Sequence, residues 1–324
     1  MADDFDILVA GGGIAGLTAG LTAARLGRSA LILTGGVPGG LLLSIDHIEG
    51  VPGFPDGVAG YELCPIAQEQ ADAAGAQFSM EQLDGIEQVD GGWTVATGEG
   101  EKSARAVILA TGASFRQLGV PGEDRLRGHG ISTCASCDAP LLRGKVAAVV
   151  GGGDSALQEA LTLAESLERV MILHRGEELD AQASYRERVL AIPAIEIRYR
   201  TVVEEILGDP SLRSVRIRDL AADAVEELEV AGLFPFVGLR PNTEQLEGRV
   251  PLDDEGRVLT DGALRTALPG VFAAGTVRRG AAGRAAAAAG EGAAAAIAAD
   301  TYLTEGSWPE ASTAVAPANG GANG

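Results

Sequence analysis

Two stretches of the chain combine short apolar runs, glycine-rich turns and helix-compatible sequence. In the first, the apolar run 5–10 ends in the glycines of 11–16, and alanines and leucines follow at helical spacing over 17–26. A second apolar run lies at 30–33. Continuous apolar runs of this length are typical of buried strands in a parallel sheet. The pattern predicts a strand, a glycine turn, a helix and a second strand within about 30 residues.

The second stretch repeats this order in the middle of the chain. The apolar run 145–150 is followed by the glycines of 151–153, by helix-compatible sequence through Leu167 and by a strand-like run at 170–173. Both stretches place a glycine turn at the start of a helix, where backbone N–H groups can approach a pyrophosphate. We therefore expect an α/β protein with two nucleotide-binding domains of the Rossmann type.

The spacing of the glycines is that of a phosphate-binding turn. The first turn fits G-x-G-x-x-G, and the second fits G-x-G-x-x-A. In this motif the first glycine permits a tight turn, the second lets the backbone approach the pyrophosphate, and the third position packs the helix on the strand. The acidic ribose ligand expected after the second strand is replaced by Thr34, whose hydroxyl can form a weaker bond to a ribose.

Two later segments resemble strands that end in turns of small residues. The run 104–109 leads into an A-T-G sequence, and the run 270–273 leads into A-G-T. An alanine-rich helix is expected from about 283 to 302, and side chains this small require a close, flat partner such as a sheet or a cofactor. The last residues, 304–324, are rich in Ser, Pro, Ala and Gly and predict a disordered tail.

Composition narrows the class of protein further. The chain has 25 basic and 45 acidic side chains and a formal net charge of −20. Binding to a nucleic-acid backbone or an anionic membrane needs clustered Lys and Arg, so neither partner is expected. No uninterrupted apolar run reaches the roughly 18 residues of a membrane span, and the acidic N-terminus does not resemble a signal peptide. We expect a cytoplasmic protein.

The cysteines point to redox chemistry. Cys134 and Cys137 form a C-x-x-C motif that Asp138 follows directly. A structural zinc site needs about four ligands, and one further cysteine and three scattered histidines do not supply them. Beside strand-helix-strand units, C-x-x-C indicates a redox dithiol. Asp138 is placed to transfer protons, to cap a helix, or both. Cys64, on the helical stretch 61–74, is expected to be buried.

The motifs occur in the order of a known family. The additional segments are Pro38-Gly39-Gly40, Pro52-Gly53-Phe54-Pro55, His174-Arg175 and Gly270-Val271-Phe272-Ala273-Ala274-Gly275. Together with the two glycine turns, the A-T-G turn and C-x-x-C-D, they resemble the low-molecular-weight thioredoxin reductases over roughly residues 4–303.

This resemblance implies two Rossmann-like domains of three ββα layers, the second inserted in the first. Residues 1–118 and 241–303 would form the FAD-binding domain, 119–240 the inserted pyridine-nucleotide domain with the C-x-x-C motif, and 304–324 the tail. It also implies a homodimer in which the cysteine pair exchanges electrons with the flavin. The substrate would be a thioredoxin-like protein or a small dithiol or disulfide.

The resemblance assigns residues to three sites and implies no metal. Cys134, Cys137 and Asp138 would be catalytic. The FAD-binding residues would be Gly11, Gly13, Ile14, Ala15, Gly16, Thr34, Gly35, Gly39, Gly40, Ala110, Thr111, Gly112, Gly275, Thr276, Arg284 and Ala285. The possible second nucleotide site would comprise Gly151, Gly153, Asp154, Ser155, His174, Arg175 and Glu177.

The second nucleotide site departs from the family pattern. NADPH-using members carry H-R-R-x-x-x-R, whose arginines hold the 2′-phosphate, whereas this chain has H-R-G-E-E-L-D at 174–180. Each lost arginine removes a charge-assisted hydrogen bond of about 1.5–3 kcal/mol, and the added carboxylates repel a phosphate. We therefore expect NADPH to be disfavoured. Either Glu177 bonds the ribose of NADH or the site binds no nucleotide.

The flavin site departs from the family pattern as well. Thr276 replaces an aspartate that usually bonds the ribityl chain, Ala285 replaces a glutamine near the ring, and Leu41 replaces another glutamine. The pocket is therefore expected to be more apolar than is usual in the family. FAD is expected nevertheless, because the pyrophosphate turn is intact.

Three functions are compatible with these motifs. The first is an FAD-dependent reductase that cycles Cys134 and Cys137 against the flavin. The second is a related oxidase that passes electrons from a small dithiol to oxygen, which the altered nucleotide site would suit. The third is a non-catalytic flavoprotein that serves as a binding partner, and the intact C-x-x-C-D motif argues against it.

Overall fold

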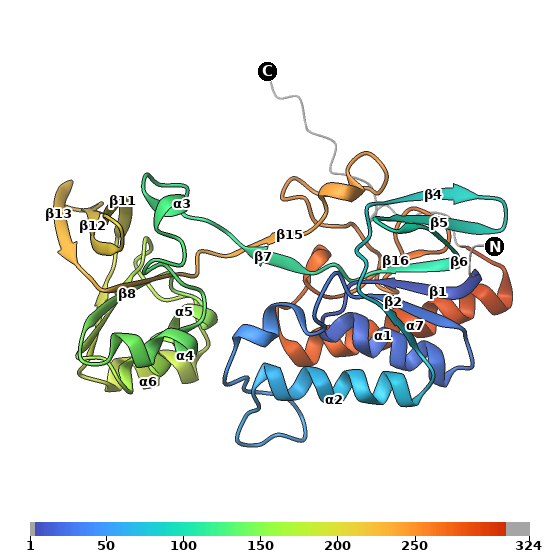
Figure 1. The fold of residues 1–324 in the computed structure, drawn as a ribbon, viewed down its shortest axis with the longest axis horizontal. Coiled ribbons are helices and arrows are strands. Elements are labelled where there is room, and N and C mark those ends of the chain that lie inside the picture. Colours follow the sequence, from blue (N-terminus) through green and yellow to red (C-terminus); the bar gives the residue numbers. More distant parts are fainter. Residues whose placement is uncertain (1–3, 309–324) are drawn as a thin grey trace. The chain divides into compact units, whose positions relative to one another are not determined.

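The chain divides into two units in the computed structural model, which describes residues 4–308. One, here called the discontinuous unit, contains the described residues up to Ser114 and from Arg240 onward. The other, here called the inserted unit, spans Phe115–Leu239. The chain therefore leaves the discontinuous unit once and returns to it once. Figure 1 traces this path from blue to red.

The discontinuous unit is built on a seven-stranded sheet with the order β3-β2-β1-β6-β5-β4, and β16 also pairs with β6. Strands β3, β2, β1, β6 and β16 run parallel, while β5 and β4 are antiparallel additions. Strands β7 (Ala113–Phe115) and β15 (Leu239–Pro241) pair with each other where the chain crosses to and from the inserted unit. The other elements are β1 (Asp4–Ala10), α1 (Ile14–Arg25), β2 (Ala30–Leu33), η1 (Gly40–Ser44), α2 (Gly60–Ala73), β3 (Gln77–Ser79), β4 (Gly85–Val89), β5 (Gly92–Thr97), β6 (Gly100–Leu109), η3 (Glu244–Leu246), β16 (Val271–Ala273), η4 (Gly275–Val277) and α7 (Ala285–Glu305).

Both faces of this sheet are covered by apolar cores. Ile7 and Val9 of β1 belong to the core formed with α1 and α7, whereas Leu8 and Ala10 belong to the opposite core, which contains Trp93 of β5. Successive side chains of a strand point to opposite faces. Residues 7–10 are continuously apolar because neither face of the sheet is exposed there. The predicted order of strand, glycine turn, helix and strand is confirmed.

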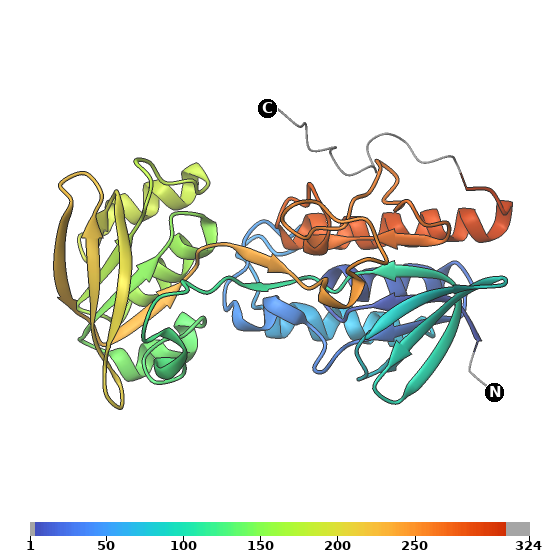
Figure 2. The same ribbon diagram turned by 90° about the horizontal axis from the view of Figure 1, so that it is seen from above.

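The alanine-rich helix α7 packs directly on α1 (Figure 2). A Cβ atom at Gly292 of α7 would overlap the carbonyl oxygen of Ala15 in α1. Ala295, Ala296 and Ala299 are fully buried in the same core. Helix α7 therefore packs against a helix as well as the sheet, whereas the sequence suggested only a flat partner. The small residues of α7 let the two helix backbones approach each other.

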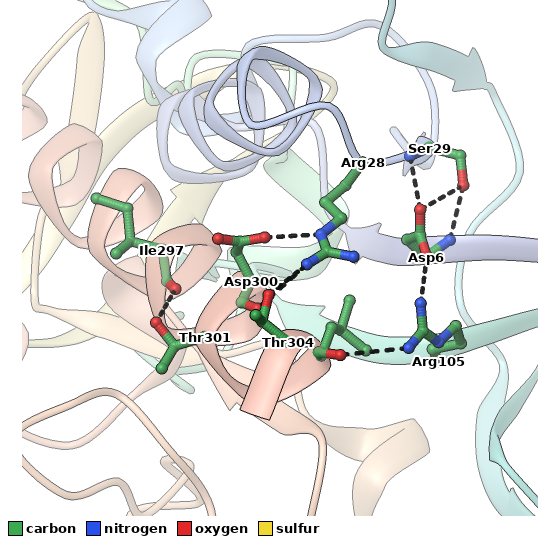
Figure 3. Close-up of polar contacts among 9 residues, drawn as sticks. Asp6, Arg28, Ser29, Arg105, Ile297, Asp300, Thr301 and Thr304 are labelled. Carbon is green, nitrogen blue, oxygen red and sulfur yellow. Dashed lines mark hydrogen bonds and ion pairs between the residues drawn. The ribbon is translucent and has the colours of Figure 1, made fainter. Parts of the chain in front are cut away.

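Polar contacts hold the last turns of α7 against the body of the unit (Figure 3). Arg28 donates through Nε to Asp300 at 2.7 Å and through Nη2 to the Thr304 hydroxyl at 2.6 Å. Arg105 donates to Asp6 at 2.7 Å, and its other terminal nitrogen lies 3.4 Å from a carbonyl oxygen of α7. These contacts join helix α7 to the segments that flank β1.

The predicted boundary of the C-terminal tail was wrong. We expected disorder over 304–324, but α7 continues to Glu305 and Trp308 packs against Phe272, with the ring centroids 5.2 Å apart. The small and polar residues of the segment predicted disorder, and its one aromatic residue, Trp308, was not enough to change that prediction. The rest of the predicted tail, 309–324, lies outside the described residues.

The inserted unit has three layers (Figure 1). Its parallel sheet has the order β10-β9-β8-β14, and a three-stranded antiparallel sheet has the order β11-β12-β13. Helices α4, α5 and α6 cover one face of the parallel sheet, and the antiparallel sheet covers the other. The elements are α3 (Glu123–Leu126), α4 (Ala135–Asp138), η2 (Ala139–Leu142), β8 (Val146–Val150), α5 (Asp154–Ala164), β9 (Arg169–Leu173), α6 (Ala183–Ala191), β10 (Ile195–Arg198), β11 (Thr201–Gly208), β12 (Leu212–Asp219), β13 (Ala224–Glu229) and β14 (Gly232–Pro235).

The predicted fold class, α/β with two Rossmann-like units, is confirmed. The helix of the second repeat ends three residues earlier than the sequence suggested, at Ala164. Across residues 4–308, no helix has the length and hydropathy that a membrane crossing demands. In the same range, His, Cys, Asp and Glu side chains form no group of three suited to a metal ion.

Candidate nucleotide and disulfide sites

Two glycines of the first turn are required by the fold itself. Gly11 has φ +124°, and a Cβ atom there would overlap the carbonyl oxygen of Ala110. A Cβ atom at Gly16 would overlap the carbonyl oxygen of Gly11. Any larger residue at either position would push the first turn of α1 away from the sheet, so these glycines fix the position of the helix N-terminus.

Gly13 is small for a different reason. It is the N-cap of α1, its φ of −73° suits any residue, and a Cβ atom there would meet nothing within 4 Å. Neither the backbone nor the packing of the described residues requires glycine. The space that a side chain would fill lies at a helix N-terminus, where backbone N–H groups without intrahelical partners attract an anion. The turn therefore fits the pyrophosphate of a dinucleotide.

The other turns predicted to bind FAD meet at this helix N-terminus. The Gly39 N–H donates to the Gly12 carbonyl at 2.8 Å, and a Cβ atom at Gly40 would lie 3.5 Å from the Cα of Gly13. A Cβ atom at Gly275 would lie 3.0 Å from the Cβ of Ala15. Turns from three distant parts of the sequence thus gather around α1.

The A-T-G turn joins the same group of segments. A Cβ atom at Gly112 would lie 3.7 Å from the hydroxyl oxygen of Thr276. Gly112 therefore brings the end of β6 close to the residue that stands in place of the family's aspartate. The other two predicted residues, Arg284 and Ala285, lie at the N-cap and the first position of α7, and Arg284 is exposed.

Thr34 is held by the backbone rather than directed outward. Its hydroxyl lies 2.6 Å from the carbonyl oxygen of Gly36 and 3.1 Å from that of Ser79. A hydroxyl has one proton to donate, so these carbonyls occupy it and leave only lone pairs to accept a bond from a ribose. The neighbouring Gly35 N–H donates to the Glu81 carbonyl at 2.9 Å, which fixes the same turn.

The second glycine turn repeats the geometry of the first. Gly151 has φ +139°, and a Cβ atom there would overlap the Phe236 carbonyl oxygen. Gly153 is the N-cap of α5 with φ −89°, and a Cβ atom there would meet nothing within 4 Å. Ala156 occupies the packing position and is buried. The inserted unit therefore also has an open helix N-terminus suited to a pyrophosphate.

His174 is a packing residue of this turn. It is buried, its Nε2 lies 2.7 Å from the Glu178 carbonyl oxygen, and its ring fills the space where side chains of Gly152 and Gly176 would lie. Gly176, which takes the place of the family's second arginine, therefore makes room for the ring. The ring shapes the loop that follows β9.

The charged residues of this loop are exposed and are mostly acidic. Arg175 is exposed, and Glu177 forms an ion pair with Arg200 at 3.0 Å. Asp154, at the start of α5, accepts bonds from the backbone and side chain of Gln182 at 2.7 and 2.6 Å. An open groove of about 390 Å³ borders the loop and is lined by Glu177, Glu178, Leu179, Ala183, Arg186, Glu187, Leu190 and Tyr199. Ser155 is exposed on α5.

Cys134 and Cys137 form a disulfide in the inserted unit. Cys134 is the N-cap of α4, and its sulfur accepts the Cys137 N–H at 3.3 Å. Cys137 is exposed, and Asp138 beside it is partly exposed. Asp138 lies at the N-cap position of η2, as one of the two roles considered for it requires, but its side chain makes no capping hydrogen bond.

Cys64 takes no part in this pair. It is fully buried in α2, and burial raises the pKa of its thiol to about 11. Its sulfur lies 3.7 Å from the Gly39 carbonyl oxygen. A thiol held protonated in an apolar site is a poor nucleophile. The prediction that Cys64 is a packing residue is confirmed.

Comparisons with known proteins agree with this arrangement. The family model of pyridine nucleotide-disulphide oxidoreductases matches residues 5–292. The thioredoxin reductase of Mycolicibacterium smegmatis is 41% identical over 301 residues, which cover 93% of this chain and 97% of that protein. The thioredoxin reductase of Treponema pallidum is 37% identical over 303 residues, which cover 94% and 98%.

The solved structure of Lactococcus lactis thioredoxin reductase matches this chain with a TM-score of 0.90 at 34% identity, covering 93% of this chain and 99% of that one. This chain belongs to the pyridine nucleotide-disulphide oxidoreductases, in the thioredoxin reductase group. It is an FAD-dependent oxidoreductase that acts on a sulfur group. These relatives do not favour the oxidase or the non-catalytic partner as its function.

Asn242 supports the A-T-G turn of this oxidoreductase and was missed in the sequence. Its side-chain amide donates to the Thr111 carbonyl at 2.9 Å, and its backbone carbonyl accepts the Thr111 hydroxyl at 2.7 Å. Its backbone N–H donates to the Gly112 carbonyl at 3.0 Å. No local pattern signals a partnership between residues 131 positions apart.

Glu291 supports the Gly275 turn and was missed too. Its carboxylate accepts the Gly275 N–H at 2.7 Å and two bonds from Arg278, at 2.9 and 2.6 Å. The Glu291 and Arg278 side chains are only 15% and 16% exposed, so the pair is shielded from water. A signal was present in the sequence, because Glu291 is the one ionisable residue between 285 and 299 in an alanine-rich helix.

We expect a Glu291→Gln substitution to lower the free energy of unfolding by about 2–3 kcal/mol, because it leaves Arg278 without its anionic partner in a poorly hydrated site. Urea unfolding followed by circular dichroism measures the change. Glu305→Gln, an exposed position at the end of the same helix, is the control and should stay within about 0.5 kcal/mol of the unaltered protein. Equal effects of the two substitutions would contradict the role given to Glu291.

Proposed function

We propose that Cys134 and Cys137 are the redox-active pair of this oxidoreductase, and that they reduce a disulfide in a thioredoxin-like protein or a small molecule. The observation that carries the proposal is the disulfide itself, which lies at the start of a helical turn with Cys137 exposed. The relatives named thioredoxin reductase support a thioredoxin-like protein as the substrate.

Reduction of a substrate by this pair is a thiol–disulfide exchange. The Cys134 thiolate attacks one substrate sulfur, forms a mixed disulfide and releases the other substrate sulfur as a thiolate. The Cys137 thiolate then attacks the Cys134 sulfur, which restores the intramolecular disulfide and releases the second substrate thiolate. Two electrons leave the pair. The Cys137 N–H that donates to the Cys134 sulfur supports Cys134 as the attacking group, since it would stabilise a thiolate there.

Asp138 is proposed to transfer protons during this exchange. It follows Cys137 directly, its carboxyl is partly exposed, and it has no capping bond. A carboxyl that reaches both water and a reacting thiol can take up the proton of a thiol and return one to a leaving thiolate.

The residues proposed to hold FAD surround the N-terminus of α1. The open space at Gly13 accommodates the pyrophosphate, and the turns at Gly39, Gly112 and Gly275 form the rest of the site. FAD, when bound, supplies a two-electron carrier between a nicotinamide nucleotide and a disulfide. Thr276 offers a hydroxyl where the family has a carboxylate, so a bond to the ribityl chain from this position would be neutral.

The second nucleotide site is proposed to prefer NADH over NADPH. The open space at Gly153 suits a pyrophosphate that both nucleotides share. The neighbouring loop carries Glu177, Glu178 and Asp180, and Glu177 forms an ion pair with Arg200. Carboxylates repel a 2′-phosphate but accept hydrogen bonds from a free ribose hydroxyl.

We expect NADH to reduce the flavin at least about tenfold more efficiently than NADPH, since one missing arginine–phosphate bond of about 1.5–3 kcal/mol has that effect. Anaerobic stopped-flow bleaching of the flavin by each nucleotide measures the preference. An Asp180→Arg substitution should raise efficiency with NADPH about tenfold, because it restores an arginine of the family motif.

Glu229→Arg is the matched control for this experiment, since it makes the same charge change at an exposed position in β13. It should leave the ratio of the two nucleotides unchanged. Faster bleaching of the unaltered protein by NADPH than by NADH would contradict the proposed preference. Bleaching by dithiothreitol with neither nucleotide active would instead favour the oxidase direction.

A homodimer is proposed from the family resemblance. The thioredoxin reductase relatives match the chain over 93% and 94% of its length, so elements that a family dimer uses have counterparts here. Light scattering of the purified holoenzyme tests this directly, with a mass of twice 33.0 kDa expected.

A further inference from the structure

A buried acidic residue contacts the helical turn that carries the cysteine pair. Glu159 lies on α5 and is 6% exposed, and its Oε2 accepts the Ala135 N–H at 2.8 Å. Ala135 is the first residue of α4 and is fully buried. The sequence gives no hint of this contact, because an acidic residue in an amphipathic helix is usually exposed.

Glu159 and the Cys134 sulfur therefore accept hydrogen bonds from the same helical turn. The Ala135 N–H donates to Glu159, and the Cys137 N–H donates to Cys134. In the disulfide state the sulfur is uncharged, so the carboxylate is the one anion bound by these two N–H groups. Reduction of the pair followed by ionisation of Cys134 would place a second anion at the same turn.

Two anions at one turn disfavour each other, and more strongly where little water separates them. Ala135 packs in the apolar core with Leu157 and Ala160 of α5, so the turn is shielded on the side that faces Glu159. The carboxylate therefore makes the reduced, ionised pair less stable relative to the disulfide. A pair whose reduced form is less stable is a stronger reductant.

We propose that Glu159 is a positioning residue that keeps the Cys134–Cys137 pair strongly reducing. It does so in two ways, by fixing the start of α4 through the Ala135 N–H and by opposing the thiolate form of Cys134. This inference rests on the proposed role of the two cysteines and assigns the control of their reducing strength to a carboxylate of α5. The same helix begins at the second glycine turn.

The test is the equilibrium of the holoenzyme with reduced and oxidised glutathione under anaerobic conditions. After acid quenching and alkylation under denaturing conditions, mass spectrometry counts one label on the oxidised chain and three on the reduced chain, since the chain has three cysteines. In the Glu159→Gln variant the amide oxygen can accept the same N–H, but the charge is gone. We expect the equilibrium constant to shift toward the dithiol by about tenfold, which corresponds to about 30 mV.

Glu165→Gln, on an exposed residue directly after α5, is the matched control and should leave the constant unchanged. Glu159→Ala removes the same charge and should shift the constant in the same direction. If either the Gln or the Ala variant does not fold, the other serves for the test. A constant within twofold of the unaltered protein in a folded variant would overturn the proposal and leave Glu159 a structural role only. A Cys134–Cys137 disulfide that dithiothreitol cannot reduce in the unaltered protein would overturn the proposed function instead.

Discussion

A Cys137→Ser substitution is expected to lower the rate of disulfide reduction by at least about a thousandfold while FAD stays bound, because one cysteine cannot complete the exchange cycle. The mixed disulfide at Cys134 would have no neighbouring thiolate to resolve it, so the reaction would stop after one substrate sulfur has been attacked. Steady-state reduction of a model disulfide measures the rate, and visible absorbance of the flavin measures the FAD content.

Cys64→Ser is the control with the same chemical change. Cys64 is buried, its pKa is raised to about 11, and it lies outside the C-x-x-C motif. This variant should keep its turnover. A Cys137→Ser protein with unchanged turnover would exclude the cysteine pair as the reaction centre. A protein that loses FAD along with turnover would show that the substitution acts on folding rather than on exchange.

A Gly13→Val substitution is expected to reduce FAD binding by at least about a hundredfold without destabilising the apoprotein. A Cβ atom there meets no atom of the described chain within 4 Å, and valine can adopt the φ of −73°, so we expect the substitution to cost the fold little. It fills the space in which the pyrophosphate would approach the helix N-terminus. FAD content after purification and titration of apoprotein with FAD, together with the melting temperature of the apoprotein, measure the two effects.

Gly98→Val is the matched control for this substitution. Gly98 is exposed between β5 and β6, its φ is not in the left-handed region, and a Cβ atom there also meets nothing within 4 Å. FAD binding should be unchanged in this variant. Normal FAD binding by the Gly13→Val protein would contradict the assignment of the first glycine turn to FAD.

The parts of the fold that could be predicted are those that a local sequence pattern indicates. The apolar run before Gly11 and the helical spacing after Gly16 are read within one segment, so the strand, turn and helix could be placed from the sequence. The same holds for the second repeat. The C-x-x-C motif is also local, because its cysteines lie within one helical turn and form a disulfide there.

Contacts between distant segments could not be predicted. The partnership of Glu159 with Ala135 spans 24 positions, and that of Asn242 with Thr111 spans 131. Each depends on where two elements meet in the fold, and neither leaves a periodic signal. The packing of Trp308 on Phe272 was not predicted for another reason. A single aromatic residue in a stretch of small and polar residues hardly changes the composition on which a disorder prediction depends.

The structure also changes the roles of two residues that the motifs singled out. The hydroxyl of Thr34 is bonded to backbone carbonyls, and His174 packs between two glycines. Both side chains support the loop in which they lie. A motif match shows where a residue lies along the chain. The hydrogen bonds that its side chain makes within the protein decide which donors and acceptors remain free to bind a ligand.

The open positions at Gly13 and Gly153 have a practical consequence for redesign. Since both turns present the same backbone surface to a pyrophosphate, they do not by themselves distinguish one dinucleotide from another. Under the proposed preference for NADH, selectivity at the second site depends on the exposed side chains after β9, among them Arg175, Glu177 and Glu178, which lie outside the apolar cores. Exchange of those side chains should alter coenzyme choice at one site without loss of thermal stability and without effect on the other site.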